Sequence, residues 1–295
     1  MKLNINNNLA KSGFGFYILT FLLLGTTLYS QSPWTKNKGE FYTQFSFSTI
    51  PNYNEIYGDP DYFSIRNITD NTFQLYGEYG VSDKTTLLLN VPFKNITTSD
   101  YVEPIPLDPF LDNGATINTF GNMEVGIKHN FINKKWLFTG QFNIELNTSS
   151  YDETSGIRTG YDAFTFTPLI NFGKSFNKSY FQGFTGFNLR TNDYSSNFKI
   201  GAEGGTKVFN RIWLVAFLDF VISLNNGDIE LPIGNQLYAL YVNNQEYTAF
   251  GLKFIGEITT DFGLIAGFGG AFSGNNVAKQ AALNFGIYYK INASK

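Results

Sequence analysis

Apolar and polar residues alternate strictly through the segment FGNMEVGIKHNF, residues 120–131. Val125 and Ile127 stand at apolar positions, whereas the charged residues Glu124 and Lys128 fall between them. A period of two residues is typical of a β-strand, because successive side chains point to opposite sides of the strand. A helix would instead bring apolar residues together every three or four positions. The segment therefore predicts a strand with one apolar face and one polar face that carries charges of both signs.

The same alternation recurs along the chain in segments of roughly ten residues, the length that a tilted strand needs to cross a bilayer. The predicted strands are residues 39–50, 72–81, 85–94, 120–131, 136–146, 164–172, 180–190, 198–208, 212–223, 250–258, 262–272 and 282–290. A sheet can span hydrocarbon only if it closes on itself, because every backbone amide needs a partner there. We therefore expect an all-β protein, a single antiparallel transmembrane β-barrel of about 12 strands.

The connections between these segments are alternately short and long, which is the pattern of outer-membrane barrels. The short ones are SDK, INKK, FNKS, FNR and TTD, and we expect them to be periplasmic turns. The long ones are mostly polar and are predicted to be extracellular loops: residues 51–71, 99–118, 149–162 and 225–245, with shorter loops near Asn192 and Asn275. Trp34, Trp136 and Trp213 each precede or begin an outward strand, where aromatic girdles form at the periplasmic interface. The position of Trp213 in the alternation, however, points it into the lumen.

Composition argues against the rival fold, a secreted soluble β-sandwich whose strands also alternate. Charged residues make up only 15% of the chain and aromatic residues 18%, whereas soluble domains carry roughly 25% charged residues. The solvent face of a sandwich would need more charge than this. The chain has no cysteine, which excludes disulfides and thiolate metal sites. No block of basic residues is present, so nucleic acid is not an expected partner.

The first thirty residues differ from the rest and predict a secretory signal peptide. Lys2 and Lys11 precede the apolar run FGFYILTFLLLGTTL, which ends at YSQS. A membrane anchor is the alternative, but a spanning helix needs roughly 20 apolar residues. We therefore predict a signal peptide at residues 1–30 and an outer-membrane barrel at residues 31–295. The expected location is the bacterial outer membrane, with membrane lipid and, during insertion, the barrel-assembly machinery as partners.

The alternation places a set of charged side chains on the lumenal face of the predicted barrel. They are Glu78, Glu124, Lys128, Glu145, Arg190, Lys199, Glu203, Lys207, Asp219, Lys253, Glu257 and Lys290. In one interpretation these residues line a path that selects a solute. In the other they form ion pairs with one another and fill a narrow barrel. Both readings require partners, because a buried ion must be paired or hydrated. Glu124 and Lys128 lie roughly 13 Å apart along one strand, so each needs a partner on a neighbouring strand, or water.

Catalytic and metal-binding patterns are weak in this chain, and no catalytic residue, metal ligand or cofactor is predicted. Its one histidine, His129, stands at a lipid-facing position of the alternation and has no serine beside it in sequence. A Ser–His catalytic pair of the lipase type is therefore disfavoured. Acidic loop residues could in principle bind calcium, but their spacing matches no EF-hand. These residues are Asp59, Asp61, Asp108, Asp112, Asp152 and Glu153.

Three fragments together resemble the outer-membrane transporter family named for the meta-pathway of phenol degradation. They are PWTKNKGEFY, LYGEYGVSDKTTLLLNVPF and FGNMEVGIKHNF, and they cover the chain from Trp34 to Phe131. Asn122 stands where that family usually has aspartate, which puts the substrate class in more doubt than the fold. The resemblance implies a barrel and the uptake of small hydrophobic or aromatic compounds; it supplies no catalytic residues. The style of the sequence and the YSQ end of the leader suggest a Gram-negative bacterium of Bacteroidota type.

The sequence therefore favours a passive outer-membrane channel or transporter for a small-molecule solute, with the lumenal charges along its path. The alternative is a non-transporting barrel, a structural or surface-binding protein whose long loops contact ligands or other proteins. A barrel enzyme is the third and least supported class.

Overall fold

The computed structural model describes residues 31–100, 114–236 and 238–292. The predicted signal peptide, residues 1–30, and most of the predicted loop 99–118 lie outside the described residues. No helix among the described residues is long and apolar enough to cross a membrane.

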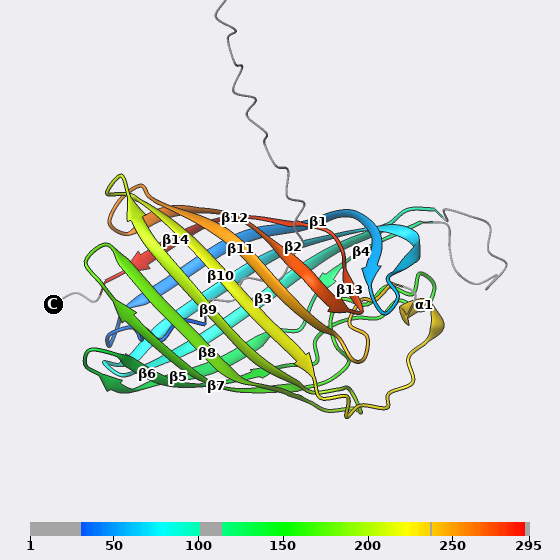
Figure 1. Cartoon of the computed structure of the whole chain (residues 1–295), viewed down its shortest axis with the longest axis horizontal. Helices are drawn as coiled ribbons and strands as arrows, with labels where there is room; N and C mark the ends of the chain where they lie inside the picture. The colour runs from blue at the N-terminus through cyan, green and yellow to red at the C-terminus, as the bar shows by residue number, and fades with distance from the viewer. Residues whose placement is uncertain (1–30, 101–113, 237, 293–295) are drawn as a thin grey trace, which may run out of the picture.

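The described chain forms one closed antiparallel barrel, with its short turns at one end and its longer connections and helix α1 at the other (Figure 1). The strands are β1 (Phe41–Tyr57), β2 (Tyr62–Ser82), β3 (Thr85–Thr98), β4 (Ala115–Phe120), β5 (Glu124–Asn133), β6 (Leu137–Glu145), β7 (Thr165–Ser175), β8 (Ser179–Arg190), β9 (Asn197–Val208), β10 (Ile212–Ser223), β11 (Glu246–Glu257), β12 (Phe262–Asn275), β13 (Val277–Ala278) and β14 (Ala282–Ile291), and α1 is Ile233–Gln236. Because β4 and β5 both pair with β3, and β13 and β14 both pair with β1, the wall has 12 strand positions. Pairing of β1 with both β2 and β14 closes the sheet. The predicted fold class is confirmed.

Strand β3 shows how the two faces of the wall are made. Leu87 and Leu89 point outward and are each 45% exposed, whereas Thr86 and Asn90 point inward and are buried. An apolar outward face and a polar inward face suit hydrocarbon on one side and a lumen on the other. Further along the same strand this polarity reverses, since Ile96 points inward and is fully buried.

The reversal continues on the neighbouring strands and explains why one predicted loop is wrong. Outward-facing Asn71, Asn95 and Asn118 hydrogen-bond to one another across β2, β3 and β4, at 3.0 and 2.6 Å. Residues 51–71, predicted to be a loop, instead lengthen β1 to Tyr57 and start β2 at Tyr62. A polar outer face there is compatible with a wall that continues above the membrane. The sequence pattern looked like a loop because apolar residues no longer stand on the outer face.

The predicted strand 120–131 is interrupted at its start. Phe120 ends β4, and β5 begins only at Glu124, so three residues lie between the two strands. Opposite this gap lies Pro92 of β3, which has no N–H group to continue the ladder, and its carbonyl accepts a hydrogen bond from the Gly121 N–H at 3.0 Å. The interruption turns the side chain of Asn122 inward, where it is buried.

Two of the three tryptophans are not part of a lipid-facing girdle. Trp34 and Trp213 lie inside the barrel on either side of Tyr180, with ring centroids 5.7 and 5.6 Å from it. The indole N–H of Trp213 donates to Glu257 at 2.9 Å. Trp136 alone faces outward among the three, with 40% of its surface exposed. The inward placement of Trp213 agrees with its position in the alternation, and Trp34 precedes β1 in a segment that enters the lumen.

Candidate functional site

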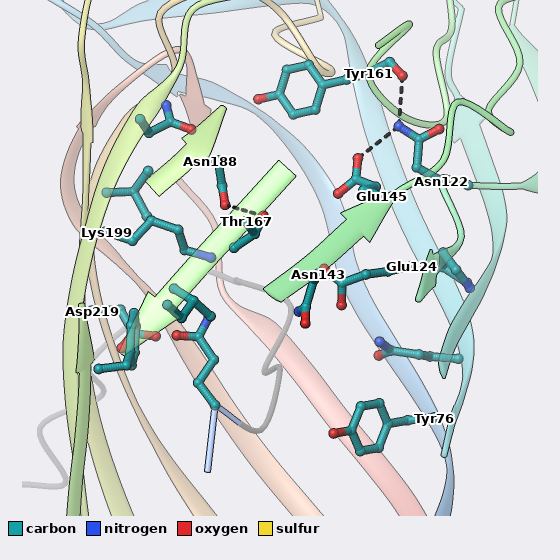
Figure 2. A pocket seen from close by; sticks show the side chains of 18 of the residues that line it. Tyr76, Asn122, Glu124, Asn143, Glu145, Tyr161, Thr167, Asn188, Lys199 and Asp219 are labelled. Carbon is teal, nitrogen blue, oxygen red and sulfur yellow. Dashed lines mark hydrogen bonds between the residues drawn. The ribbon is translucent and has the colours of Figure 1, made fainter. Parts of the chain in front are cut away.

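The lumen contains a central cavity of about 270 Å³ lined mostly by charged, amide and phenol side chains. Its charged groups come from strands β3, β5, β6, β8, β9, β10 and β11. Figure 2 shows Glu124 and Glu145 on one side of this space and Lys199 and Asp219 on the other.

One wall of the cavity carries two carboxylates side by side. Glu124 of β5 and Glu145 of β6 are direct partners in the antiparallel ladder, so both side chains point into the lumen from adjacent strands. The amide of Asn122 donates to Glu145 at 2.9 Å and to the carbonyl of Tyr161 at 2.7 Å. No ion pair is formed by either glutamate with another residue in the described part of the chain.

The opposite wall carries two cations and one further carboxylate. Arg190 of β8 lies over the ring of Tyr161, at 3.9 Å from its centroid, and donates to the carbonyl of Ser195 at 2.7 Å. Lys199 of β9 interacts electrostatically with Glu124 and Asp219. Its ammonium makes no hydrogen bond or direct ion pair with any described residue.

The other predicted lumenal charges form direct contacts with one another or with rings. Lys128 pairs with Glu78 at 3.1 Å, and Lys36 binds the second oxygen of Glu78 at 3.1 Å. Lys253 pairs with Glu203, which also accepts from Gln182 and from the phenol of Tyr180. Nearer the short turns, Lys207 pairs with Glu257 at 2.6 Å, and Lys290 lies 4.9 Å from the centre of the Tyr288 ring. The structure thus separates the ion-paired residues, of which Glu203 and Lys253 also line the cavity, from five cavity residues without a direct ion pair to a described residue: Glu124, Glu145, Arg190, Lys199 and Asp219.

Residues 31–36, here called the strap, lie inside the lumen near the short turns, at the end that is expected to be periplasmic. The carbonyl of Pro33 accepts a hydrogen bond from Thr139 of β6 at 2.7 Å. The N–H of Lys36 donates to Thr86 of β3 at 2.8 Å. The strap is therefore bound to two strands that only β5 separates, and Trp34 packs against Tyr180 of β8.

A turn fixes the end of the strap just before β1. The backbone and side-chain amides of Asn37 donate to the two oxygens of Glu40 at 2.9 and 2.8 Å. These hydrogen bonds hold the pKa of the Glu40 carboxyl below its ordinary value. The turn is a polar anchor that keeps the strap directed into the barrel.

The extracellular end is closed differently, by residues 149–162 and 225–245, here called the cover. Ile157, Tyr238 and Leu240 of the cover pack against Ile68 and Ile96, which point inward from the wall. The four aliphatic residues are at most 6% exposed, so the contact is a dry apolar cluster inside the mouth of the barrel. The cover is therefore held by the same kind of packing as a protein core.

Polar contacts join the cover to the cavity and to the rim. Buried Lys94 binds both oxygens of Asp70, at 3.0 and 2.9 Å, and lies over the ring of Tyr241. At the outer rim, Lys279 binds Glu55 and Asp61. The hydrogen bond from Lys279 lowers the pKa of Asp61 below its ordinary value.

Several cavity residues escaped the sequence-based prediction. Tyr161, Tyr241 and Gln245 line the cavity from segments predicted to be external loops. No periodicity marks a loop residue that folds back into a lumen. The alternation of residues 85–94 places Lys94 on the lumenal face, so this residue could have been predicted. Asn197 is uncharged, and no sequence feature distinguishes it from other polar residues.

Among the described residues, His129, Asp61 and Asp152 lie in hydrogen bonds and ion pairs and not in a cluster that could hold a metal ion. His129 contacts the hydroxyl of Thr85 through Nδ1 at 2.9 Å and the edge of Phe131. Asp152 accepts the hydroxyl of Ser155 at 2.6 Å, and Asp61 is engaged by Lys279. Asp108 and Asp112 lie outside the described residues. Within the described ranges, no group of three or more His, Cys, Asp or Glu side chains could hold a metal ion.

No family model matches the chain, and no curated protein matches it in sequence. The COG4313 outer membrane channel from Pseudomonas putida F1 is similar in structure, with a TM-score of 0.68 and 14% identity over 90% of this chain and 100% of that one. The KdgM porin in complex with disordered oligogalacturonate has a TM-score of 0.50 and 6% identity, covering 84% and 98% of the two chains. The NanC porin has a TM-score of 0.49 and 7% identity, covering 85% and 100%. At these identities the likeness concerns the fold, which is that of outer-membrane β-barrels and is consistent with a location in that membrane. The resemblance to the phenol meta-pathway family stays a prediction.

Proposed function

We propose that this protein is an outer-membrane channel for the passive passage of small polar solutes, held closed here by the strap below and the cover above. The observation that carries the proposal is the central cavity, where eight charged groups line open space and five of them have no direct ion pair with a described residue. A barrel with only a structural role would gain by filling this space with paired or apolar side chains.

The composition of the cavity supports a polar solute over the hydrophobic or aromatic one that the family resemblance implies. A solute without hydrogen-bonding groups would strip water from Glu124, Lys199 and their neighbours without replacing it, which is unfavourable. Rings of Trp34, Tyr180 and Trp213 do line a second space nearer the strap. An aromatic portion of a solute could be accommodated there, but the charged cavity would still lie on its path.

The strap is the closure that we expect to move. It is one short segment attached by a few polar contacts, whereas the cover is held by apolar packing on several strands. Lys36 also holds one oxygen of Glu78, so displacing the strap would leave Glu78 paired with Lys128 alone. The wall of the barrel does not depend on the strap for its own ladder.

Planar-bilayer recording tests the proposal with the full mature chain and with a variant that lacks residues 31–36. We expect small, intermittent conductance from the first and a several-fold larger, steadier conductance from the second. Heat-modifiable migration on a gel serves as the control that both proteins are folded barrels. If the folded deletion variant carries no current and passes no small sugar into liposomes, the protein is a non-transporting barrel.

A further inference from the structure

Five charged residues that line the central cavity, Glu124, Glu145, Arg190, Lys199 and Asp219, have no direct ion pair with a described residue, although paired Lys94, Glu203 and Lys253 line the same cavity. Glu78 with Lys128, Asp70 with Lys94 and Glu203 with Lys253 are all in contact. Around the cavity, by contrast, two carboxylates face each other as ladder partners, an arrangement that is destabilising by itself. The other predicted lumenal ions are ion-paired, except for Lys290, whose ammonium lies over the Tyr288 ring.

A second observation, independent of the carboxylates, comes from Asn197. This residue begins β9, lines the cavity and is fully buried. Its amide N–H donates to the carbonyl of Gln245 at 3.0 Å, but its side-chain oxygen accepts no hydrogen bond. The Nε of Arg190, on the neighbouring strand, is buried and likewise unpartnered. A buried acceptor and a buried donor without partners are costly unless something fills the cavity and binds them.

The two walls differ in charge, with two carboxylates on one and two cations beside Asp219 on the other, and this limits what can occupy the space. A simple cation would be attracted by Glu124 and Glu145 but repelled by Arg190 and Lys199. A simple anion would be attracted by Arg190 and Lys199 but repelled by Glu124 and Glu145. A solute that carries both charges satisfies both walls at once, since charge-assisted hydrogen bonds are the strong ones in a medium of low dielectric.

We propose that the central cavity is a binding site for a small zwitterion, whose ammonium group lies between Glu124 and Glu145 and whose anionic group faces Lys199 and Arg190. Asn197 then accepts a hydrogen bond from the solute. The inference rests on the proposed channel function and names the solute class of the same site. The cavity of about 270 Å³ has room for several water molecules, so a short aliphatic zwitterion fits.

Isothermal titration calorimetry on the full chain, folded in detergent, tests the site with three probes of matched carbon chain. The probes are 4-aminobutyrate, which has both charges, butylamine, which has only the ammonium, and butyrate, which has only the carboxylate. We expect 4-aminobutyrate to bind at least about tenfold more tightly than either of the others. Equal affinity for all three probes, or no binding of 4-aminobutyrate, overturns the proposal.

Charge-neutralising variants assign the two ends of the probe. Glu145→Gln and Lys199→Gln should each weaken 4-aminobutyrate binding at least about tenfold, and Glu124→Gln combined with Glu145→Gln should strengthen butyrate binding. This gain cannot come from misfolding, and heat-modifiable migration checks each variant. Glu55→Gln, at the rim, is the matched control and should leave every affinity unchanged. A double variant that binds butyrate no better than the parent chain contradicts the assignment.

The outcome is separable from that of the channel proposal, because binding in detergent does not require conduction. A protein that conducts ions in planar bilayers but does not distinguish the three probes is a channel without this site. A protein that binds 4-aminobutyrate selectively but passes no current is a zwitterion-binding barrel, and only the transport proposal fails.

Discussion

The two ends of the lumen are closed by opposite means. At the extracellular end, residues from two segments of the cover and three strands of the wall form a dry apolar cluster around Ile68. At the end with the short turns, the strap lies in the lumen as a single segment held by hydrogen bonds, one ion pair and the ring contact of Trp34. The cluster behaves as an extension of the folded core, whereas the strap can leave without exposing a comparable apolar surface.

This difference indicates which end of the lumen opens at the lower cost in free energy. Burial of a large aliphatic side chain contributes roughly 1.5–3 kcal/mol, so lifting the cover costs several such contributions. An individual hydrogen bond contributes only about 0.5–1.5 kcal/mol net, because water replaces it. The barrel is therefore expected to open at the strap while the cover stays in place.

The largest stability effect should come from weakening the cover. Ile157→Ala removes a fully buried side chain and should cost about 2–5 kcal/mol through the cavity that it leaves. We expect residues 149–162 to become accessible to added protease at the extracellular side, with a lower denaturant midpoint if the cover unfolds with the wall. Unchanged protease resistance would show that the cluster does not hold the cover.

The smallest effect should come from the rim of the same end. Lys279→Gln removes the exposed cation that binds Glu55 and Asp61, and exposed ion pairs contribute little. Because the pKa of Asp61 is lowered in the folded protein, its contribution is fully present above its ordinary value of 3.8 and is lost as the pH falls through the lowered value. The difference in unfolding midpoint between the parent chain and the variant should be small at neutral pH and should vanish in acid. A difference that grows in acid would contradict this reading of the rim.

The barrel could be predicted from sequence because lipid imposes a strict two-residue period on each strand. The same rule failed at residues 51–71, where the wall continues but its outward side chains, such as Asn71, are polar. It also failed at residues 120–123, where Pro92 on the neighbouring strand breaks the ladder. Both failures depend on what surrounds the strand, the medium in one case and the neighbouring strand in the other. The alternation within a single strand reports neither.

The lumenal face could be predicted residue by residue, but the pairing could not. Glu78 and Lys128 lie on strands separated by β3, and their contact depends on the register of two ladders. The register also places Glu124 opposite Glu145 rather than opposite a cation. The two charged residues of β5 therefore differ in role. Lys128 forms an ion pair that fills the lumen, whereas Glu124 faces the open cavity.

A disulfide between the strap and the wall tests most directly whether the strap gates the channel. The chain has no cysteine, so Lys36→Cys combined with Thr86→Cys introduces a single disulfide where the Lys36 N–H and the Thr86 hydroxyl are 2.8 Å apart. Tyr57→Cys with Val277→Cys, which are cross-strand partners in β1 and β13, is the matched control within the wall.

Single-channel conductance of the strap variant, measured in planar bilayers before and after reduction, gives the decisive comparison. We expect a closed channel when the disulfide is formed and a several-fold larger conductance after reduction, with no redox effect in the control. Equal conductance in the two redox states of the strap variant would show that the strap is not the gate.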